Sequence, residues 1–148
     1  MNKLFILLTI ILIALFSIFL VAFLQYKPNG FELKDNIVLD IIDGDTFVLG
    51  NGENVRLICV DSPEQGEKGY EEAKEFLSGL ILNKQVQLEK DVSETDEYGR
   101  LLRYVYLFQN ETKIFVNKEI VRQGFGELFP YGNDTKRCGE IAEENVPF

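Results

Sequence analysis

Three short segments hold the carboxylates and guanidinium groups of this chain that could act together on a phosphate ester. The first is Asp43-Gly44-Asp45-Thr46, the second extends from Arg56 to Glu64, and the third from Asp96 to Arg100. Carboxylate oxygens are ligands that Ca²⁺ and Mg²⁺ prefer, and a guanidinium can donate two parallel hydrogen bonds to phosphate oxygens. Such a set could hydrolyse a phosphodiester with a metal ion and a water molecule.

Each segment also has a purely structural interpretation. Asp-Gly is common in tight hairpin turns, so the first segment taken alone is most simply a turn. Arg56 lies in an alternating apolar strand, where it faces either solvent or a cleft that pairs it with a carboxylate or phosphate. Asp61 and Glu64 stand at the end of that strand, and Arg100 follows a loop that a glycine closes.

The composition excludes several other kinds of catalytic site. The chain of 148 residues contains no histidine, so a Ser-His-Asp centre, a Cys-His centre and a histidine-ligated zinc are all unavailable. The net charge of −9 disfavours a broad electrostatic footprint on nucleic acid. Any contact with nucleic acid should therefore be local, through a metal ion and a few arginines.

The first residues form an uncharged apolar run from Leu4 to Leu24. A helix of this length spans roughly 30 Å, about the thickness of the hydrocarbon core of a bilayer. We expect a signal anchor over residues 1–27, a linker over residues 28–36 and one domain over residues 37–148. The flanking charges favour export of the domain only weakly, so a cleaved and secreted form and a domain facing the cytoplasm stay open.

The pattern after the linker predicts an α+β domain. We expect strands near residues 37–42, 46–49, 54–60, 86–88 and 101–108, because these runs alternate or end at turn signals. Helical spacing predicts helices over residues 70–82 and 116–123, with a further helix possible over residues 136–145. Order alone supports no more than a strand meander with helices.

Four ordered motifs resemble those of the staphylococcal nuclease (thermonuclease) family. They are Ile42-Asp-Gly-Asp-Thr46, Arg56-Leu-Ile-Cys-Val-Asp-Ser-Pro-Glu64, Thr95-Asp-Glu-Tyr-Gly-Arg100 and Val121-Arg-Gln-Gly124, and the resemblance covers roughly residues 37–130. It implies a five-stranded OB-fold-type β-barrel with about three helices. It also implies hydrolysis of DNA and RNA with Ca²⁺ as the cofactor.

The resemblance assigns a role to nine residues of the motifs. It makes Asp45, Asp61 and the main-chain carbonyl of Ser62 the metal ligands. Asp43 and Thr46 would support that site through water. Glu64 matches the catalytic glutamate, Arg56 and Arg100 match the two arginines that grip phosphate, and Tyr98 matches a tyrosine that touches a nucleotide phosphate.

The chain departs from the family in its acidic, brief C-terminal tail and in Glu97, which places a negative charge where a lysine is expected. Tyr131 is a candidate for one member of the aromatic pair that the family has beyond the third motif. An alternative function is a catalytically silent, membrane-anchored binding module for nucleic acid or protein. Loss of catalysis normally removes the carboxylates and arginines, and this chain keeps them.

Two cysteines, Cys59 and Cys138, leave two possibilities open. They are either buried thiols or, if the domain lies outside the cytoplasm, one disulfide. Export, and the expected docking of a helix that contains Cys138, motivate the disulfide as a hypothesis.

Overall fold

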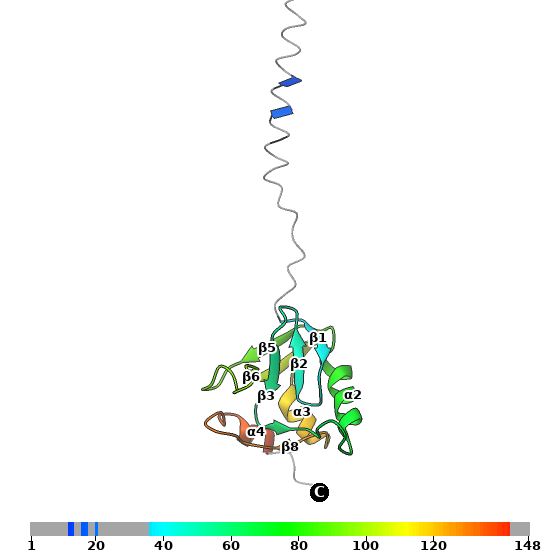
Figure 1. The fold of residues 1–148 in the computed structure, drawn as a ribbon, viewed down its shortest axis with the longest axis vertical. Coiled ribbons are helices and arrows are strands. Elements are labelled where there is room, and N and C mark those ends of the chain that lie inside the picture. The colour runs from blue at the N-terminus through cyan, green and yellow to red at the C-terminus, as the bar shows by residue number, and fades with distance from the viewer. Residues whose placement is uncertain (1–11, 14–15, 18–19, 21–35, 143–148) are drawn as a thin grey trace, which may run out of the picture. The chain divides into compact units, whose positions relative to one another are not determined.

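The computed structural model describes residues 36–142 and, before them, residues 12, 13, 16, 17 and 20 (Figure 1). Among these residues, no helix is long and apolar enough to cross a membrane. The expected anchor over residues 1–27 and the linker over residues 28–36 lie almost entirely outside the described residues, as does the end of the domain after residue 142.

A mixed sheet of six strands forms the frame of the domain. Its strands are β1 (Val38–Ile41), β2 (Thr46–Leu49), β3 (Asn54–Leu57), β5 (Val86–Glu89), β6 (Leu101–Gln109) and β7 (Thr112–Phe115). The order is β1-β2-β3-β6-β5, and β7 pairs with the other end of β6. β1, β2 and β3 form an antiparallel meander because short turns join them, whereas β3 and β6 run parallel.

The expected closed barrel is not found among the described residues. The sheet edges β1 and β5 meet only at one antiparallel bridge, between Ile37 and Gln85. Backbone hydrogen bonds of 3.0 Å from Val38 to Lys84 and 2.9 Å from Val86 to Asn36 flank that bridge. Both edge strands have four residues and β1 contains a register shift, so no continuous ladder joins them.

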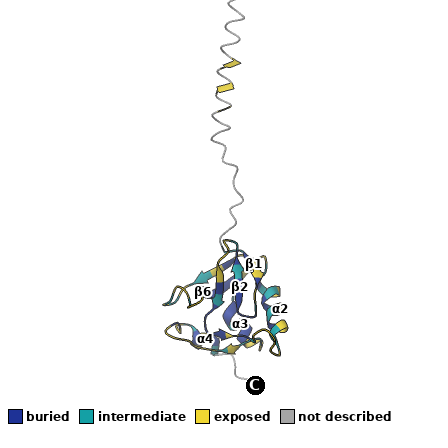
Figure 2. Cartoon of the chain, in the orientation of Figure 1, coloured by how far each residue is buried: buried dark blue, intermediate teal, exposed yellow. Residues whose placement is uncertain are grey.

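Three helices of the described part pack around this sheet, as the sequence predicts in number. α2 (Tyr70–Ile81) lies beside β1, and α3 (Val116–Arg122) lies below β2 in Figure 1. α2 buries Ala73, Leu77 and Ile81, which recur every four residues on one face. α3 is largely buried, as its dark colour in Figure 2 shows, and Gly124 with a φ of 78° follows its end.

The elements of the structure differ from the expectation at the end of the third strand, in an additional strand pair and in the last helix. The third strand was expected to reach residue 60, but the chain turns at Cys59, whose φ is 62°. A separate strand, β4 (Val60–Asp61), then pairs with β8 (Glu127–Leu128), which the sequence pattern did not predict. The last helix, α4 (Cys138–Ala142), is shorter than expected within the described residues.

The Cys59–Cys138 disulfide is present, which confirms the second of the two possibilities for the cysteines. Their Cα atoms are 5.6 Å apart, and both side chains are buried in the core. The bond therefore ties α4 to the turn that ends β3.

Candidate active site

Arg56 contacts two carboxylates that come from different parts of the fold, Asp45 in the turn before β2 and Asp61 in β4. Its guanidinium lies 2.7 Å from Asp45 Oδ2 and 3.0 Å from Asp61 Oδ1. It also donates a hydrogen bond of 2.7 Å to the carbonyl oxygen of Val60. β3 thus presents Arg56 to the turn before β2 on one side and to β4 on the other, which settles the alternatives for this arginine in favour of a carboxylate-lined cleft.

The turn from Asp43 to Thr46 is built around Asp45. Asp43 Oδ1 accepts a hydrogen bond from the amide of Asp45 at 3.0 Å, and the Thr46 hydroxyl donates to Asp45 Oδ1 at 3.0 Å. Asp43 and Thr46 therefore support Asp45 by direct hydrogen bonds, whereas the resemblance implied support through water. The turn fixes Asp45 before any ligand binds.

Asp45 is buried, and its carboxylate is nearly saturated by partners. Its side chain is 4% exposed, and Oδ2 also accepts a hydrogen bond of 2.8 Å from the amide of Ser62. Burial raises the pKa of Asp45 to about 6, even though the positive charge of Arg56 acts in the opposite direction. A second positive charge at this position would therefore stabilise the ionised carboxylate.

The predicted metal ligands lie together, although they do not form a cage of side chains. Asp45 and Asp61 share Arg56, and the buried Ser62 lies beside Asp45. Within residues 36–142 and the five described residues before them, no three or more Asp, Glu, Cys or His side chains converge as a metal site. Two carboxylates and a main-chain carbonyl are hard oxygen donors, so their chemistry fits Ca²⁺ or Mg²⁺.

Arg100 is held by its own loop. Asp96 Oδ2 lies 2.7 Å from Arg100 Nε, and Asp96 Oδ1 accepts hydrogen bonds from the amides of Tyr98 at 3.0 Å and Arg100 at 2.9 Å. Gly99 has a φ of 79°, which closes the turn. The Tyr98 ring lies 5.3 Å from the guanidinium carbon of Arg100 and is largely exposed.

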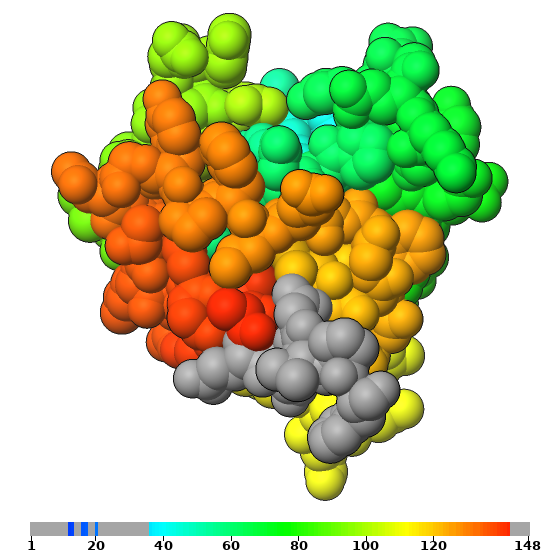
Figure 3. Space-filling view, turned by 90° about the horizontal axis from the view of Figure 1, so that it is seen from below, coloured from blue at the N-terminus to red at the C-terminus, as the bar shows by residue number. Residues whose placement is uncertain are grey.

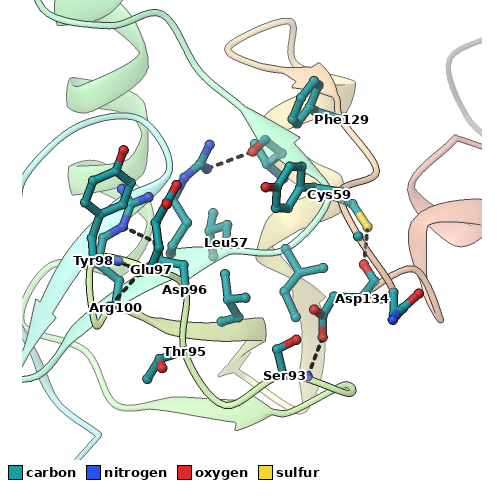
Figure 4. A pocket seen from close by; sticks show the side chains of 17 residues that line it. Leu57, Cys59, Ser93, Thr95, Asp96, Glu97, Tyr98, Arg100, Phe129 and Asp134 are labelled. Carbon is teal, nitrogen blue, oxygen red and sulfur yellow. Dashed lines mark hydrogen bonds and ion pairs between the residues drawn. The ribbon is translucent and has the colours of Figure 1, made fainter.

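A pocket of about 580 Å³ contains Arg56, Tyr98 and Arg100 in its lining (Figure 4). Tyr98, Glu97 and Arg100 gather on one side of the view, and Phe129 lies across from them. Phe129 stacks on Tyr131 with ring centroids 6.3 Å apart. The pocket therefore combines two cations with an exposed aromatic rim, and the predicted residues Arg56 and Arg100 come together in it.

Glu64 lies outside the pocket that Arg56 and Arg100 share. It lies in the exposed loop before α2, and its backbone amide donates to Glu67 Oε2 at 2.9 Å. Its carboxylate has no hydrogen bond or ion pair within the part of the chain that the structure describes. Glu64 lines neither the 580 Å³ pocket nor a second hollow of about 520 Å³ beside Asp61 and Ser62.

The protein-family model described as "Staphylococcal nuclease homologue" matches residues 54–144 of the chain. The chain belongs to the staphylococcal nuclease family. It is 35% identical to a thermonuclease of Staphylococcus hyicus over 96 residues, covering 59% of this chain and 54% of that protein. It is 32% identical to a thermonuclease of Staphylococcus intermedius over 105 residues, covering 64% and 62%.

Another relative in this family is endonuclease YncB of Bacillus subtilis, 34% identical over 113 residues, which cover 68% of this chain and 52% of that protein. The chain thus spans little more than half the length of these relatives. The relatives in this family bear the names thermonuclease and endonuclease.

Sequence reasoning missed two parts of the pocket. Phe129 stands in a run of aromatic and turn residues, Phe129-Pro-Tyr-Gly132, which is a recognisable signal for an exposed aromatic loop. Asp134 also lines the pocket, and its carboxylate accepts hydrogen bonds from backbone amides of a loop about 40 residues earlier. The sequence carries no signal for such a contact.

Proposed function

We propose that this chain is a Ca²⁺-dependent nuclease that hydrolyses phosphodiester bonds of DNA and RNA by attack of water. The observation that carries the proposal is that Arg56 and Arg100 line one pocket while Arg56 also contacts Asp45 and Asp61. Arginines alone would suit a module that only binds phosphate, so the two carboxylates beside Arg56, those of Asp45 and Asp61, are what favours chemistry.

The two arginines would hold the phosphate from different elements. Arg56 comes from the middle of β3, and Arg100 comes from the loop that leads into β6. Each guanidinium can donate to phosphate oxygens, and such contacts strengthen as negative charge develops on those oxygens in the transition state. Asp96 holds Arg100 and Val60 holds Arg56, so both side chains are oriented before substrate binds.

Asp45, Asp61 and the carbonyl of Ser62 are the groups that would hold the cation. When bound, Ca²⁺ supplies positive charge that polarises a phosphate oxygen and offsets its charge. The Thr46 hydroxyl and the amide of Ser62 already fix the carboxylate of Asp45. Arg56 contacts both carboxylates, so we expect a bound cation to replace Arg56 as the partner of some of their oxygen atoms.

Glu64 would orient the attacking water or accept a proton from it. An exposed carboxylate without a protein partner is free to bind water, which suits a general base. Its loop begins directly after Asp61 and Ser62, so Glu64 is only three residues from a predicted cation ligand.

The exposed rings favour unpaired nucleic acid as the substrate. Tyr98, Phe129 and Tyr131 are 77%, 50% and 71% exposed, and all three line the pocket. Bases of a single strand stack on such rings without regard to sequence. Glu97 lines the same pocket, and its charge would weaken the binding of a polyanion there.

Cleavage of single-stranded DNA and RNA with Ca²⁺, Mg²⁺ or EDTA tests the proposal. We expect cleavage with Ca²⁺ that falls by at least about a hundredfold in Arg100→Ala and in Glu64→Gln. Arg122→Ala is the matched control for Arg100, because Arg122 is also paired with a nearby carboxylate, that of Glu119, but lies outside the pocket. A folded wild type that binds DNA without cutting it would support the binding module instead.

The location of the domain is also a proposal. The uncharged run from Leu4 to Leu24 supports a single-pass anchor, and the Cys59–Cys138 disulfide supports an oxidising, extracytoplasmic compartment. We expect the chain to fractionate with membranes and to be digested when protease is added to intact cells. Protection from protease would indicate a domain that faces the cytoplasm, and recovery from the medium would indicate a secreted form.

A further inference from the structure

The segment from Asp134 to Cys138 contacts both parts of the chain that carry the pocket arginines. In Figure 3, the orange-to-red surface of the C-terminal segment lies beside the yellow-green surface of the loop before β6. The segment contains no residue of the predicted catalytic set. Its contacts nevertheless attach the loop of Arg100 to the turn after Arg56, in addition to the direct pairing of β3 with β6.

The first contact is made by Asp134. Its Oδ1 atom accepts hydrogen bonds from the amides of Val92 at 2.9 Å and Ser93 at 2.8 Å, and Figure 4 shows the second of these. Asp134 is 6% exposed, so these bonds are shielded from water. Val92 and Ser93 begin the loop that leads through Tyr98 to Arg100.

A second set of bonds fastens the start of the same loop. Asp91 Oδ2 accepts hydrogen bonds from the Tyr104 hydroxyl at 3.0 Å and from the amide of Lys136 at 2.9 Å. The Tyr104 hydroxyl in turn accepts a hydrogen bond of 3.1 Å from the amide of Arg137. Residues 91–93 are thus attached to the segment at several points.

The other end of the segment is covalently fixed. Cys138 forms the disulfide with Cys59, which stands three residues after Arg56 in the turn that ends β3. The amide of Phe129 also donates to the carbonyl oxygen of Cys59 at 3.1 Å. The segment therefore connects the β3 turn with the loop of Arg100.

We infer that Asp134 is a positioning residue, which acts through the amides of Val92 and Ser93 to hold in place the loop whose Asp96 orients the Arg100 side chain. The inference rests on the proposed function, because it assigns the two arginines to one phosphate-binding pocket. Asp134 itself need not touch the substrate. Burial acts to raise the pKa of Asp134, but the hydrogen bonds from the Ser93 amide and side chain and from the Val92 amide, together with the charge of Lys90, lower it.

The test is a double-mutant cycle on the full chain with single-stranded DNA. Asp134→Ala should lower kcat/KM by about tenfold when Arg100 is present and by less than about twofold in the Arg100→Ala background. Asp134→Asn keeps an oxygen that can accept both amide hydrogen bonds, so it should retain activity within about threefold of the wild type. Equal losses from Asp134→Ala in both backgrounds would overturn the inference.

Two further measurements separate positioning from simple loss of stability. Ile81→Val removes a buried methyl group in α2, away from the pocket, and should leave kcat/KM unchanged below its melting temperature. Hydrogen exchange should accelerate in Asp134→Ala from Val92 through to Arg100. Acceleration confined to Val92 and Ser93 would contradict positioning.

Failure of the proposed function gives a different result. If the wild-type chain cuts no nucleic acid, the nuclease proposal fails, while exchange at the Arg100 amide still decides whether Asp134 holds the loop. If the chain cuts DNA and the cycle shows no coupling, the nuclease proposal stands and the role of Asp134 is wrong.

Discussion

Gly44 allows the turn that carries Asp45 to approach the rest of the site, and its replacement provides a sharp test of that geometry. A Cβ atom at this position would lie 2.6 Å from the Cβ of Ala73 and 2.7 Å from the Cβ of Ser62. Neither neighbour is the flexible end of a side chain. Gly44→Ala should therefore displace the turn from α2 and from the loop that carries Ser62.

The expected cost follows from the overlap. Ordinary carbon contacts lie near 3.5–4.0 Å, so the backbone would have to move by roughly 1 Å. Overpacking of this kind costs about 1–3 kcal/mol, and 1 kcal/mol corresponds to about 4–8 °C in Tm for a domain of this size. We expect Gly44→Ala to lower Tm by about 4–24 °C.

Activity should fall by more than stability explains. The amide of Ser62 donates to Asp45 Oδ2 at 2.8 Å, and a shift of the turn would break this bond between two predicted ligands. We expect kcat/KM of Gly44→Ala to fall by at least about tenfold at a temperature where the variant is still folded.

Gly79→Ala is the matched control, because Gly79 lies in α2 with no atom within 4 Å of its added Cβ. Alanine there should stabilise the helix by about 0.5–1 kcal/mol and leave activity unchanged. Thermal unfolding followed by circular dichroism, with kinetics at 20 °C or below, measures both effects. A Gly44→Ala protein as stable and active as the wild type would refute the close packing of the turn.

Three further predictions concern stability. Burial opposes ionisation of Glu89, but hydrogen bonds from the two basic residues before α4 prevail and lower its pKa from 4.5 to about 2. The contribution of Glu89 to the free energy of unfolding, about 1–2 kcal/mol after solvent screening, should thus be complete above pH 4.5 and disappear as the pH falls towards 2. Urea unfolding of Glu89→Gln should show a weaker pH dependence of this free energy than the wild type. The same pH dependence in both proteins would contradict this prediction. Asn117 is fully buried and bonds three backbone groups of other elements, so Asn117→Ala should cost about 2–4 kcal/mol in urea unfolding, and a loss below about 1 kcal/mol would show that these bonds are dispensable. The Cys59–Cys138 bond closes a separation of 79 residues, so its reduction should cost about 2–4 kcal/mol, whereas two free thiols in protein from its native compartment would remove this basis.

Local sequence determined much of the fold because short-range rules apply there. The hairpin between β1 and β2 follows from an Asp-Gly turn between apolar strands, and α2 follows from apolar residues at helical spacing. Gly124 marks the end of α3 as predicted. The motifs also identified Asp45, Arg56 and Asp61, which the fold then brings into contact.

Only the tertiary structure decided how the two arginines meet. β3 and β6 pair in parallel, with Val55 opposite Leu101, which brings the strand of Arg56 alongside the end of the Arg100 loop. Nothing local specifies this pairing, because about 45 residues separate the strands and many partners are compatible with an apolar strand. The closed barrel expected from the resemblance is not found among the described residues for a related reason, since edge contacts depend on strand length and register.

The same limit applies to the C-terminal segment. The sequence does not tell whether two cysteines form a disulfide. It also does not tell from which backbone amides an aspartate such as Asp134 accepts hydrogen bonds. The β4–β8 pair and the bonds from Asp134 to Val92 and Ser93 join residues that are distant in the chain. The sequence by itself determined the chemical groups and their local turns, whereas packing of the whole chain determined which groups share a pocket, because long-range contacts depend on every element at once.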